Sequence, residues 1–222
     1  MNNFDTFIAN VKSVYLEEIM SETRKLLIFS EYKDVFEVIK NLLKDNEKLV
    51  IAIDGRCGGG KSSLGTMLTE EFDCTLFHMD DFFLPFEMKI SERLSKAGEN
   101  VHYERFEEEI LRPLKNNKPV IYRKYLCNKW EFSQPIKVET KNLTIVEGSY
   151  SLHPALRNYY DYKIFITVDS KVQYERILKR NGKEKLQDFL NKWIPMEEDY
   201  FKELDIKNQC DLILDTTMIK LE

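Results

Sequence analysis

One short segment constrains the fold of this chain more than any other. The apolar run Leu-Val-Ile-Ala-Ile over residues 49–53 leads directly into Gly-Arg-Cys-Gly-Gly-Gly-Lys-Ser over residues 55–62. The second stretch fits the pattern G-x-x-x-x-G-K-[ST] at every fixed position. Four of the eight glycines of the chain fall within residues 55–60, so the backbone can turn until its N–H groups converge on an anionic group. The alternative is an ordinary glycine-rich turn that caps a helix, but the complete motif between a strand and a helix favours a phosphate-binding loop.

This motif predicts how a nucleotide, taken to be ATP, binds to the loop. Lys61 is expected to reach the β- and γ-phosphates, and the Ser62 hydroxyl is expected to bind Mg²⁺. The helix that follows adds the positive end of its dipole. The predicted nucleotide contacts are Gly55, Gly58, Gly59, Gly60, Lys61, Ser62 and Ser63.

The rest of the chain continues the alternation of strand and helix. Short, almost uninterrupted apolar runs follow at residues 75–77, 143–146, 164–168 and 212–214, a pattern typical of strands that are covered on both faces. Helical patterns lie between most of them, at 61–72, 103–117 and 171–193. We therefore expect an α/β fold with a doubly wound, mainly parallel sheet and helices on both faces. Ligands of such sheets bind beyond the carboxyl ends of the strands.

Length, charge and composition limit the number of domains and the kinds of molecule that this chain can bind. A chain of 222 residues suits one α/β domain, here residues 1–222 with a helical extension at 1–46. The net charge of -5 arises from interspersed charges, so no basic surface is expected to hold nucleic acid. The N-terminus lacks the features of a signal peptide, and no apolar run has the length of a membrane span. The four cysteines have no CxxC spacing. Together these features predict a cytoplasmic protein that binds a small molecule and no membrane.

Acidic residues follow two of the predicted strands. Asp80 and Asp81 follow the run at residues 75–77 after His78 and Met79, and a carboxylate there could orient an acceptor hydroxyl and take its proton. If the chain is still extended at this point, only one of the two can face the acceptor. Glu147, followed by Gly148, ends the third run at the position of an acid that holds Mg²⁺ through water. Loop or helix-cap carboxylates are the alternative interpretation of all three.

These segments resemble the uridine kinase family, within the wider group that holds nicotinamide riboside kinase, pantothenate kinase and phosphoribulokinase. Met-Asp-Asp-Phe-Phe over residues 79–83 is similar to the family's Asp-x-Phe-aromatic signature, and Val-Glu-Gly over 146–148 to its Glu-Gly step. The resemblance runs from about residue 48 to about residue 215. It implies a P-loop NTPase fold, an ATP:alcohol phosphotransferase activity and Asp80 as the catalytic base, with Asp81 at a variable position.

The resemblance also implies a helical lid at about residues 170–202. Arg176 and Arg180 are four residues apart and share a helix face, so both could approach the transferring phosphoryl group. A solvated basic face is the alternative. Residues 119–122, returning near 136–138, are expected to form a small β-hairpin over the acceptor site. Candidate acceptor contacts are Asp81, His102, Tyr103, Tyr122 and Arg123, and surface tyrosines are the competing interpretation.

We thus expect a Mg²⁺-dependent kinase that transfers the γ-phosphoryl group of ATP to a hydroxyl of a small metabolite. A uridine-like nucleoside is the first choice of acceptor, and pantothenate-like and sugar acceptors stay open. The alternative is a nucleotide-binding ATPase or sensor module that acts through a protein partner. The N-terminal helices could serve such a partner, pack on the sheet or form a homo-oligomer. Cys57, close to Lys61 and a helix N-terminus, is predicted to have a lowered thiol pKa, unless it is simply a small residue tolerated in a loop.

Overall fold

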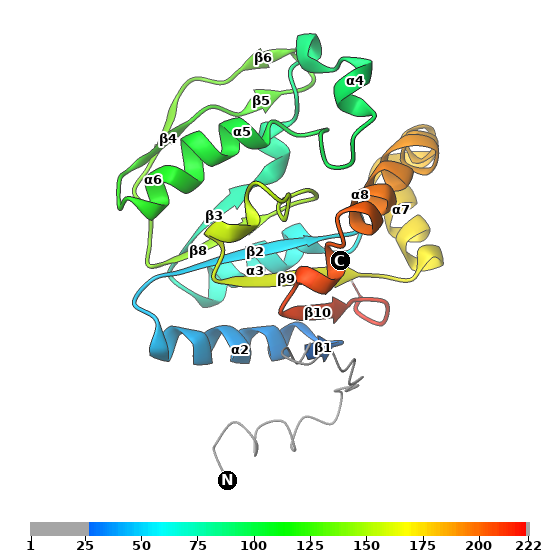
Figure 1. Cartoon of the computed structure of the whole chain (residues 1–222). Helices are drawn as coiled ribbons and strands as arrows, with labels where there is room; N and C mark the ends of the chain where they lie inside the picture. Colours follow the sequence, from blue (N-terminus) through cyan, green and yellow to red (C-terminus); the bar gives the residue numbers. More distant parts are fainter. Residues whose placement is uncertain (1–26, 221–222) are drawn as a thin grey trace.

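A computed structural model describes residues 27–220, which form a parallel sheet between two layers of helices (Figure 1). The sheet has six strands in the order β1-β10-β9-β2-β8-β3, and every neighbouring pair is parallel. The strands are β1 (Leu27–Phe29), β2 (Leu49–Gly55), β3 (Cys74–His78), β8 (Leu143–Glu147), β9 (Tyr162–Thr167) and β10 (Leu212–Asp215). The predicted fold class is therefore confirmed.

Successive side chains of the central strand β2 point to opposite faces of the sheet, and each face carries a hydrophobic core. Ile51 and Ile53 point to one face, where they join a cluster with Leu64 of α3 (Lys61–Glu71) and with α2 (Tyr32–Asp45). Ala52 points to the other face and belongs to the cluster that contains Phe106. On that side one helical run consists of α5 (Tyr103–Phe106), the π-helix η3 (Glu107–Leu111) and α6 (Arg112–Lys115). Figure 1 shows α2 below the sheet and α5 and α6 above it.

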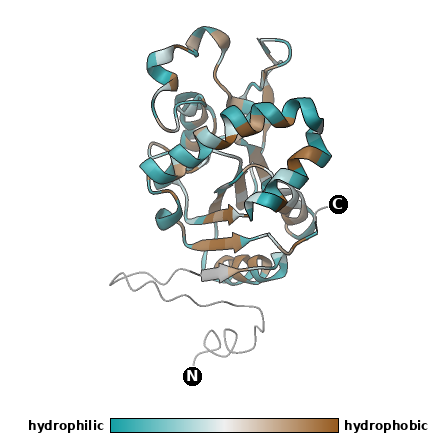
Figure 2. Ribbon diagram, turned by 90° about the vertical axis from the view of Figure 1, so that its right-hand side faces the viewer, coloured by the Kyte–Doolittle hydropathy of each residue, from teal (hydrophilic) through white to brown (hydrophobic). Residues whose placement is uncertain are grey.

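A second helical run stands beside the carboxyl ends of the strands. It consists of α7 (Ser170–Asp188), the π-helix η5 (Phe189–Trp193) and α8 (Ile194–Glu203). The Asp169 carboxylate caps its start by accepting the N–H of Lys171 at 2.9 Å, and Gly182 interrupts α7 with φ 78° and ψ 172°. In Figure 2 this run faces the viewer and is largely hydrophilic, whereas the strands behind it are hydrophobic.

The predicted hairpin is also confirmed. The strand β4 (Val120–Tyr122) pairs antiparallel with β7 (Ile136–Val138), and between them β5 (Tyr125–Leu126) pairs with β6 (Glu131–Phe132). Short helical turns complete the fold: η1 (Met79–Phe82), η2 (Phe86–Met88), α4 (Ser91–Leu94), η4 (Arg157–Tyr159) and η6 (Lys207–Gln209).

The start of the described chain and the segment after β3 differ from what the sequence suggests. The sequence does not predict the edge strand β1, and residues 1–26 of the expected helical extension lie outside the described residues. The chain is not extended after β3, because Met79–Phe82 forms a 3-10 turn, so the alternation of side chains in a strand does not apply to Asp80 and Asp81. Between residues 27 and 220, no helix has the length and apolar character needed to cross a membrane.

Candidate active site

The predicted phosphate loop, residues 55–62, begins in the middle of the sheet. It leaves β2, which lies between β9 and β8, and enters α3. Gly55 has φ 127°, and a Cβ at this position would lie 2.0 Å from the carbonyl oxygen of Ile166. Gly60 precedes α3 with φ 94° in the left-handed region. Only glycine allows this path so close to β9, and the resulting backbone cradle fits a phosphate chain.

The Lys61 side chain folds back over the loop that precedes it. It is buried, and its ammonium donates to the carbonyl oxygens of Gly55 at 2.6 Å and Arg56 at 3.1 Å. These contacts hold the positive charge of the Lys61 ammonium beside the loop backbone.

The strand register brings Ser62, His78 and Glu147 together. Within the sheet, His78 is the residue of β3 that pairs with Glu147 of β8. Glu147 is buried, and its Oε1 lies 2.5 Å from His78 Nδ1, a hydrogen bond that raises the pKa of His78. The Ser62 hydroxyl lies 3.3 and 3.2 Å from the two Glu147 oxygens. A hydroxyl and a carboxylate that face each other offer oxygen ligands of the kind that Mg²⁺ prefers.

Asp54, which the sequence did not single out, connects the phosphate loop to the segment after β8. The side chain is fully buried, and burial raises its pKa to about 6. Its oxygens accept the N–H groups of Gly55 at 2.7 Å, Tyr150 at 3.2 Å and Leu152 at 2.9 Å, and the hydroxyl of Tyr200 at 2.8 Å. These bonds fix the two loops relative to each other.

The two consecutive aspartates of the 3-10 turn η1 have different surroundings. Asp80 is exposed and lines the central cavity. Desolvation by the surrounding protein raises the pKa of Asp80, and the charge of Lys61 opposes this rise. Asp81 points elsewhere and forms an ion pair with Lys124 at 3.0 Å. The turn therefore separates the two carboxylates that the sequence placed side by side.

The two arginines of α7 also differ. Arg176 donates to the hydroxyl of Thr216 at 2.9 Å, to the carbonyl oxygens of Thr216 and Ile219 at 2.6 Å each, and to that of Gly58 at 3.3 Å. It thereby joins the lid helix to the segment after β10 and to the phosphate loop. Arg180 is exposed, one turn further along.

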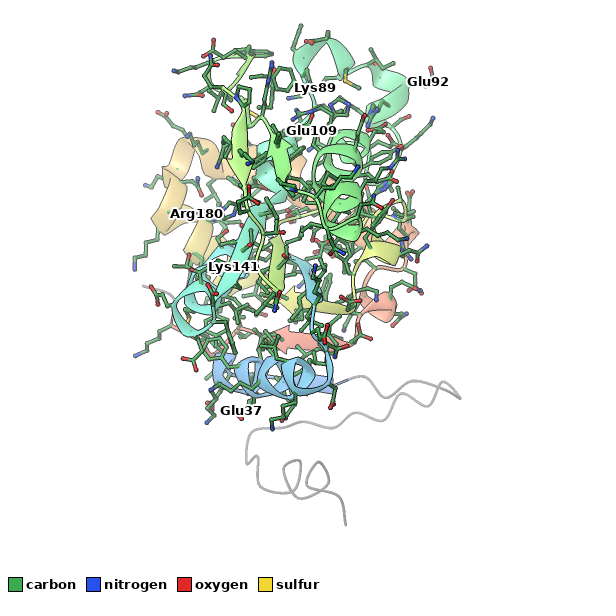
Figure 3. All side chains as sticks on the ribbon, turned by 90° about the vertical axis from the view of Figure 1, so that its left-hand side faces the viewer. Glu37, Lys89, Glu92, Glu109, Lys141 and Arg180 are labelled. Atoms are coloured by element: carbon green, nitrogen blue, oxygen red, sulfur yellow. The ribbon has the colours of Figure 1, made fainter. Side chains whose placement is uncertain are left out.

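A single cavity of about 640 Å³ joins the phosphate loop, the end of β8 and the helical run. The predicted site residues that line it are Gly58, Gly60, Lys61, Ser62, Ser63, Asp80, Glu147, Arg176 and Arg180. Gly55 and Gly59 shape the loop without lining the cavity. Lining residues that sequence reasoning missed include Lys89, Phe189, Trp193 and Glu197. Figure 3 shows Lys89 at the end of the molecule remote from Glu37 of α2, and Arg180 on α7.

The candidate acceptor contacts lie outside this cavity. Tyr122 is buried and stacks on Phe82 with ring centroids 5.7 Å apart. Tyr103 stacks on His153 at 4.0 Å. The structure gives the cavity no lining atom from the set Asp81, His102, Tyr103, Tyr122 and Arg123.

The prediction for the Cys57 thiol is wrong. Burial raises the pKa of Cys57 above its ordinary value, and the nearby Glu197 carboxylate adds to this rise. These two effects outweigh the opposing charge of Lys61. A neutral, largely enclosed thiol is the consequence.

Comparisons with known proteins agree with this geometry. The model of the phosphoribulokinase / uridine kinase family matches residues 50–215. A uridine kinase of Ligilactobacillus salivarius is 26% identical over 160 residues, which cover 64% of this chain and 70% of that relative.

Two solved structures share the fold. One, described as a possible uridine kinase from Bacillus stearothermophilus, has a TM-score of 0.60 and 19% identity over 82% of this chain and 100% of that one. The other, a D-glycerate 3-kinase from Cryptococcus neoformans, has a TM-score of 0.54 and 16% identity over 76% of this chain and 89% of that one.

Proposed function

Since the chain belongs to the phosphoribulokinase / uridine kinase family, we propose that this phosphotransferase moves the γ-phosphoryl group of ATP to a hydroxyl of a small metabolite. One observation carries the proposal. Asp80 opens into the same cavity as Lys61 and the phosphate loop, but from a different strand end. A carboxylate opposite a phosphate cradle is the arrangement that phosphoryl transfer to a hydroxyl requires.

The donor half of the site is the phosphate loop with its two oxygen ligands. The loop N–H groups and Lys61 would bind the phosphates of ATP. Ser62 and Glu147 would hold Mg²⁺, because their oxygens already face each other at 3.2–3.3 Å. When bound, Mg²⁺ supplies positive charge that neutralises the phosphate oxygens.

The acceptor half is organised around Asp80. Its carboxylate would orient the acceptor hydroxyl and take the proton as the oxygen–phosphorus bond forms. Arg180, exposed on the lid, would stabilise charge on the transferring group. Arg176 would act at the same place, while its hydrogen bonds to Thr216 and Ile219 hold it in position.

The cavity and the family support a choice of acceptor classes to test. A volume of about 640 Å³ is in the range of small-molecule sites. The aromatic rings of Phe83, Phe189 and Trp193 offer surfaces on which a base could stack, which supports a uridine-like nucleoside as the first choice. Lys89 lines the same cavity and forms no ion pair among residues 27–220, so acidic hydroxy compounds and sugars belong in the same screen.

The test is ADP formation from Mg·ATP with a panel of nucleosides, sugars and hydroxy acids. We expect turnover that depends on one class of acceptor, with the phosphorylated product visible by mass spectrometry. Lys61→Ala serves as the inactive control. ATP hydrolysis at the same rate with every compound and with none would contradict a kinase and favour the ATPase or sensor alternative.

A further inference from the structure

The peptide groups of Cys57, inside the phosphate loop, are bound by the helical run and not left for phosphate. Its N–H donates to Glu197 Oε2 of α8 at 2.9 Å. Its carbonyl oxygen accepts from Gln173 Nε2 of α7 at 2.8 Å. The two partners come from opposite ends of the run that includes the lid, so both ends of the run hold one residue of the loop.

Both partners are unusual among polar side chains because they are buried. Gln173 is 4% exposed and Glu197 is 5% exposed. The second oxygen of Glu197 accepts the hydroxyl of Ser149 at 2.5 Å, two residues after Glu147. Burial of a carboxylate is costly unless hydrogen bonds compensate it. Both Glu197 oxygens therefore serve to connect α8 to the phosphate loop and to the segment that carries the candidate metal ligand.

We propose that Glu197 and Gln173 are positioning residues that hold the phosphate loop in its nucleotide-binding shape. This inference rests on the proposed function, because it presumes a nucleotide donor. A glycine-rich loop has much conformational freedom to lose, and contacts that order it beforehand reduce the cost of binding. Within the loop itself, the N–H of Gly59 donates to the carbonyl of Arg56 at 3.0 Å. The hydrogen bonds from Glu197 and Gln173 to Cys57 restrain the loop backbone next to that turn.

The neighbouring residue Glu198 provides a matched control. Its carboxylate binds the guanidinium of Arg56 at 2.7 and 3.2 Å, and its side chain is 42% exposed. An ion pair with that exposure contributes little. Glu197 and Glu198 thus carry the same charge on the same helix, but only Glu197 holds loop backbone.

The experiment is calorimetric titration of Mg·ADP into the full chain and its variants, with thermal unfolding measured in parallel. Glu197→Gln and Glu197→Ala both remove the negative charge, but Gln retains an oxygen for the Cys57 N–H and an amide that can donate to Ser149. We expect Glu197→Gln to bind at least as tightly as the wild type. Glu197→Ala should bind about tenfold more weakly than Glu197→Gln, because the loop N–H loses its acceptor. Glu198→Gln should stay within about threefold of the wild type.

Equal affinity of the Ala and Gln variants at position 197, with both folded, would overturn the proposal. If both variants bind Mg·ADP more weakly than the wild type and to the same extent, the charge of Glu197 and not its hydrogen bond is what matters. If Glu197→Ala does not fold, Gln173→Leu decides, because it removes the donor to the Cys57 carbonyl and is expected to weaken Mg·ADP several-fold. Unchanged affinity in that variant again overturns the proposal. A wild-type chain that does not bind Mg·ADP refutes the proposed function instead.

Discussion

The Ser62 hydroxyl lies 3.3 and 3.2 Å from the two carboxylate oxygens of Glu147, although 85 residues separate them in the chain. The sheet explains the contact. The strands β2 and β8 are neighbours with Ile53 opposite Glu147, so the helix that follows the first strand begins beside the end of the second. Two oxygen donors are thereby fixed in place before any ligand arrives.

This pair predicts the metal requirement. Ser62→Ala and Glu147→Gln should each raise the Mg²⁺ concentration needed for half-maximal ADP formation by at least roughly tenfold, because each removes one oxygen ligand or its charge. Thr66→Ala, on the exposed side of the same helix, is the control. An unchanged Mg²⁺ titration in either site variant would remove that residue from the set of metal ligands.

Lys61 is expected to be indispensable for transfer but not for folding. Lys61→Met keeps an unbranched side chain of similar length and removes the ammonium that contacts the carbonyl oxygens of Gly55 and Arg56. Turnover should fall by roughly 10²–10³-fold, the range found when a preorganised charge-stabilising donor is lost. Circular dichroism should show a folded chain. Turnover close to that of the wild type would contradict the phosphate-loop assignment.

Substitution of the two lid arginines, Arg176 and Arg180, should affect the stability of the fold differently. Arg176→Ala loses its bonds to Thr216 and Ile219, so we expect unfolding to be easier by about 2 kcal/mol, or roughly 4–8 °C in Tm. Arg180→Ala should leave Tm unchanged and lower kcat more than it weakens ATP binding. Thermal unfolding and steady-state kinetics on both variants check this. A loss of ground-state ATP affinity alone in Arg180→Ala would make that arginine a binding residue.

The sequence predicted those parts of the fold and site that depend on local chemistry. Short apolar runs marked five of the six strands of the sheet, and the spacing of Gly55, Gly60 and Lys61 marked the loop. The edge strand β1 has only three residues, too few for a periodic signal. Tyr122 appeared as a candidate ligand because a tyrosine in a hairpin suits a pocket and a core equally well. Its stacking on Phe82 depends on the tertiary fold.

The residues that sequence analysis missed share one property. Asp54, Gln173 and Glu197 are buried polar side chains whose partners lie 96 to 146 residues away in most of their hydrogen bonds. In the sequence each looks like a residue on a solvated helix or at the end of a strand. Their partners are backbone groups and hydroxyls, which carry no motif, so only the folded structure reveals them.

The pH dependence of turnover should reflect the ionisation of the Asp80 carboxylate. This carboxylate must be ionised to accept a proton, so kcat falls as the pH drops through its pKa. Desolvation by the surrounding protein raises that pKa, Glu147 and Glu197 raise it further, and Lys61 and His78 oppose them. The acidic limb should therefore lie above the value of about 4 typical of aspartate. Glu197→Gln removes one negative charge and should move the limb to lower pH. A limb that shifts upward in this variant would contradict the assignment.

Single-turnover phosphoryl transfer to the acceptor found in the screen, measured for Asp80→Asn and Asp81→Asn side by side, tests whether Asp80 is the acceptor base. Asp80→Asn keeps the shape of the side chain but removes the proton acceptor, and should slow transfer by roughly 10²–10⁴-fold. Asp81→Asn loses only the ion pair with Lys124 and should transfer at nearly the wild-type rate. A large loss in Asp81→Asn together with nearly normal transfer by Asp80→Asn would contradict the account.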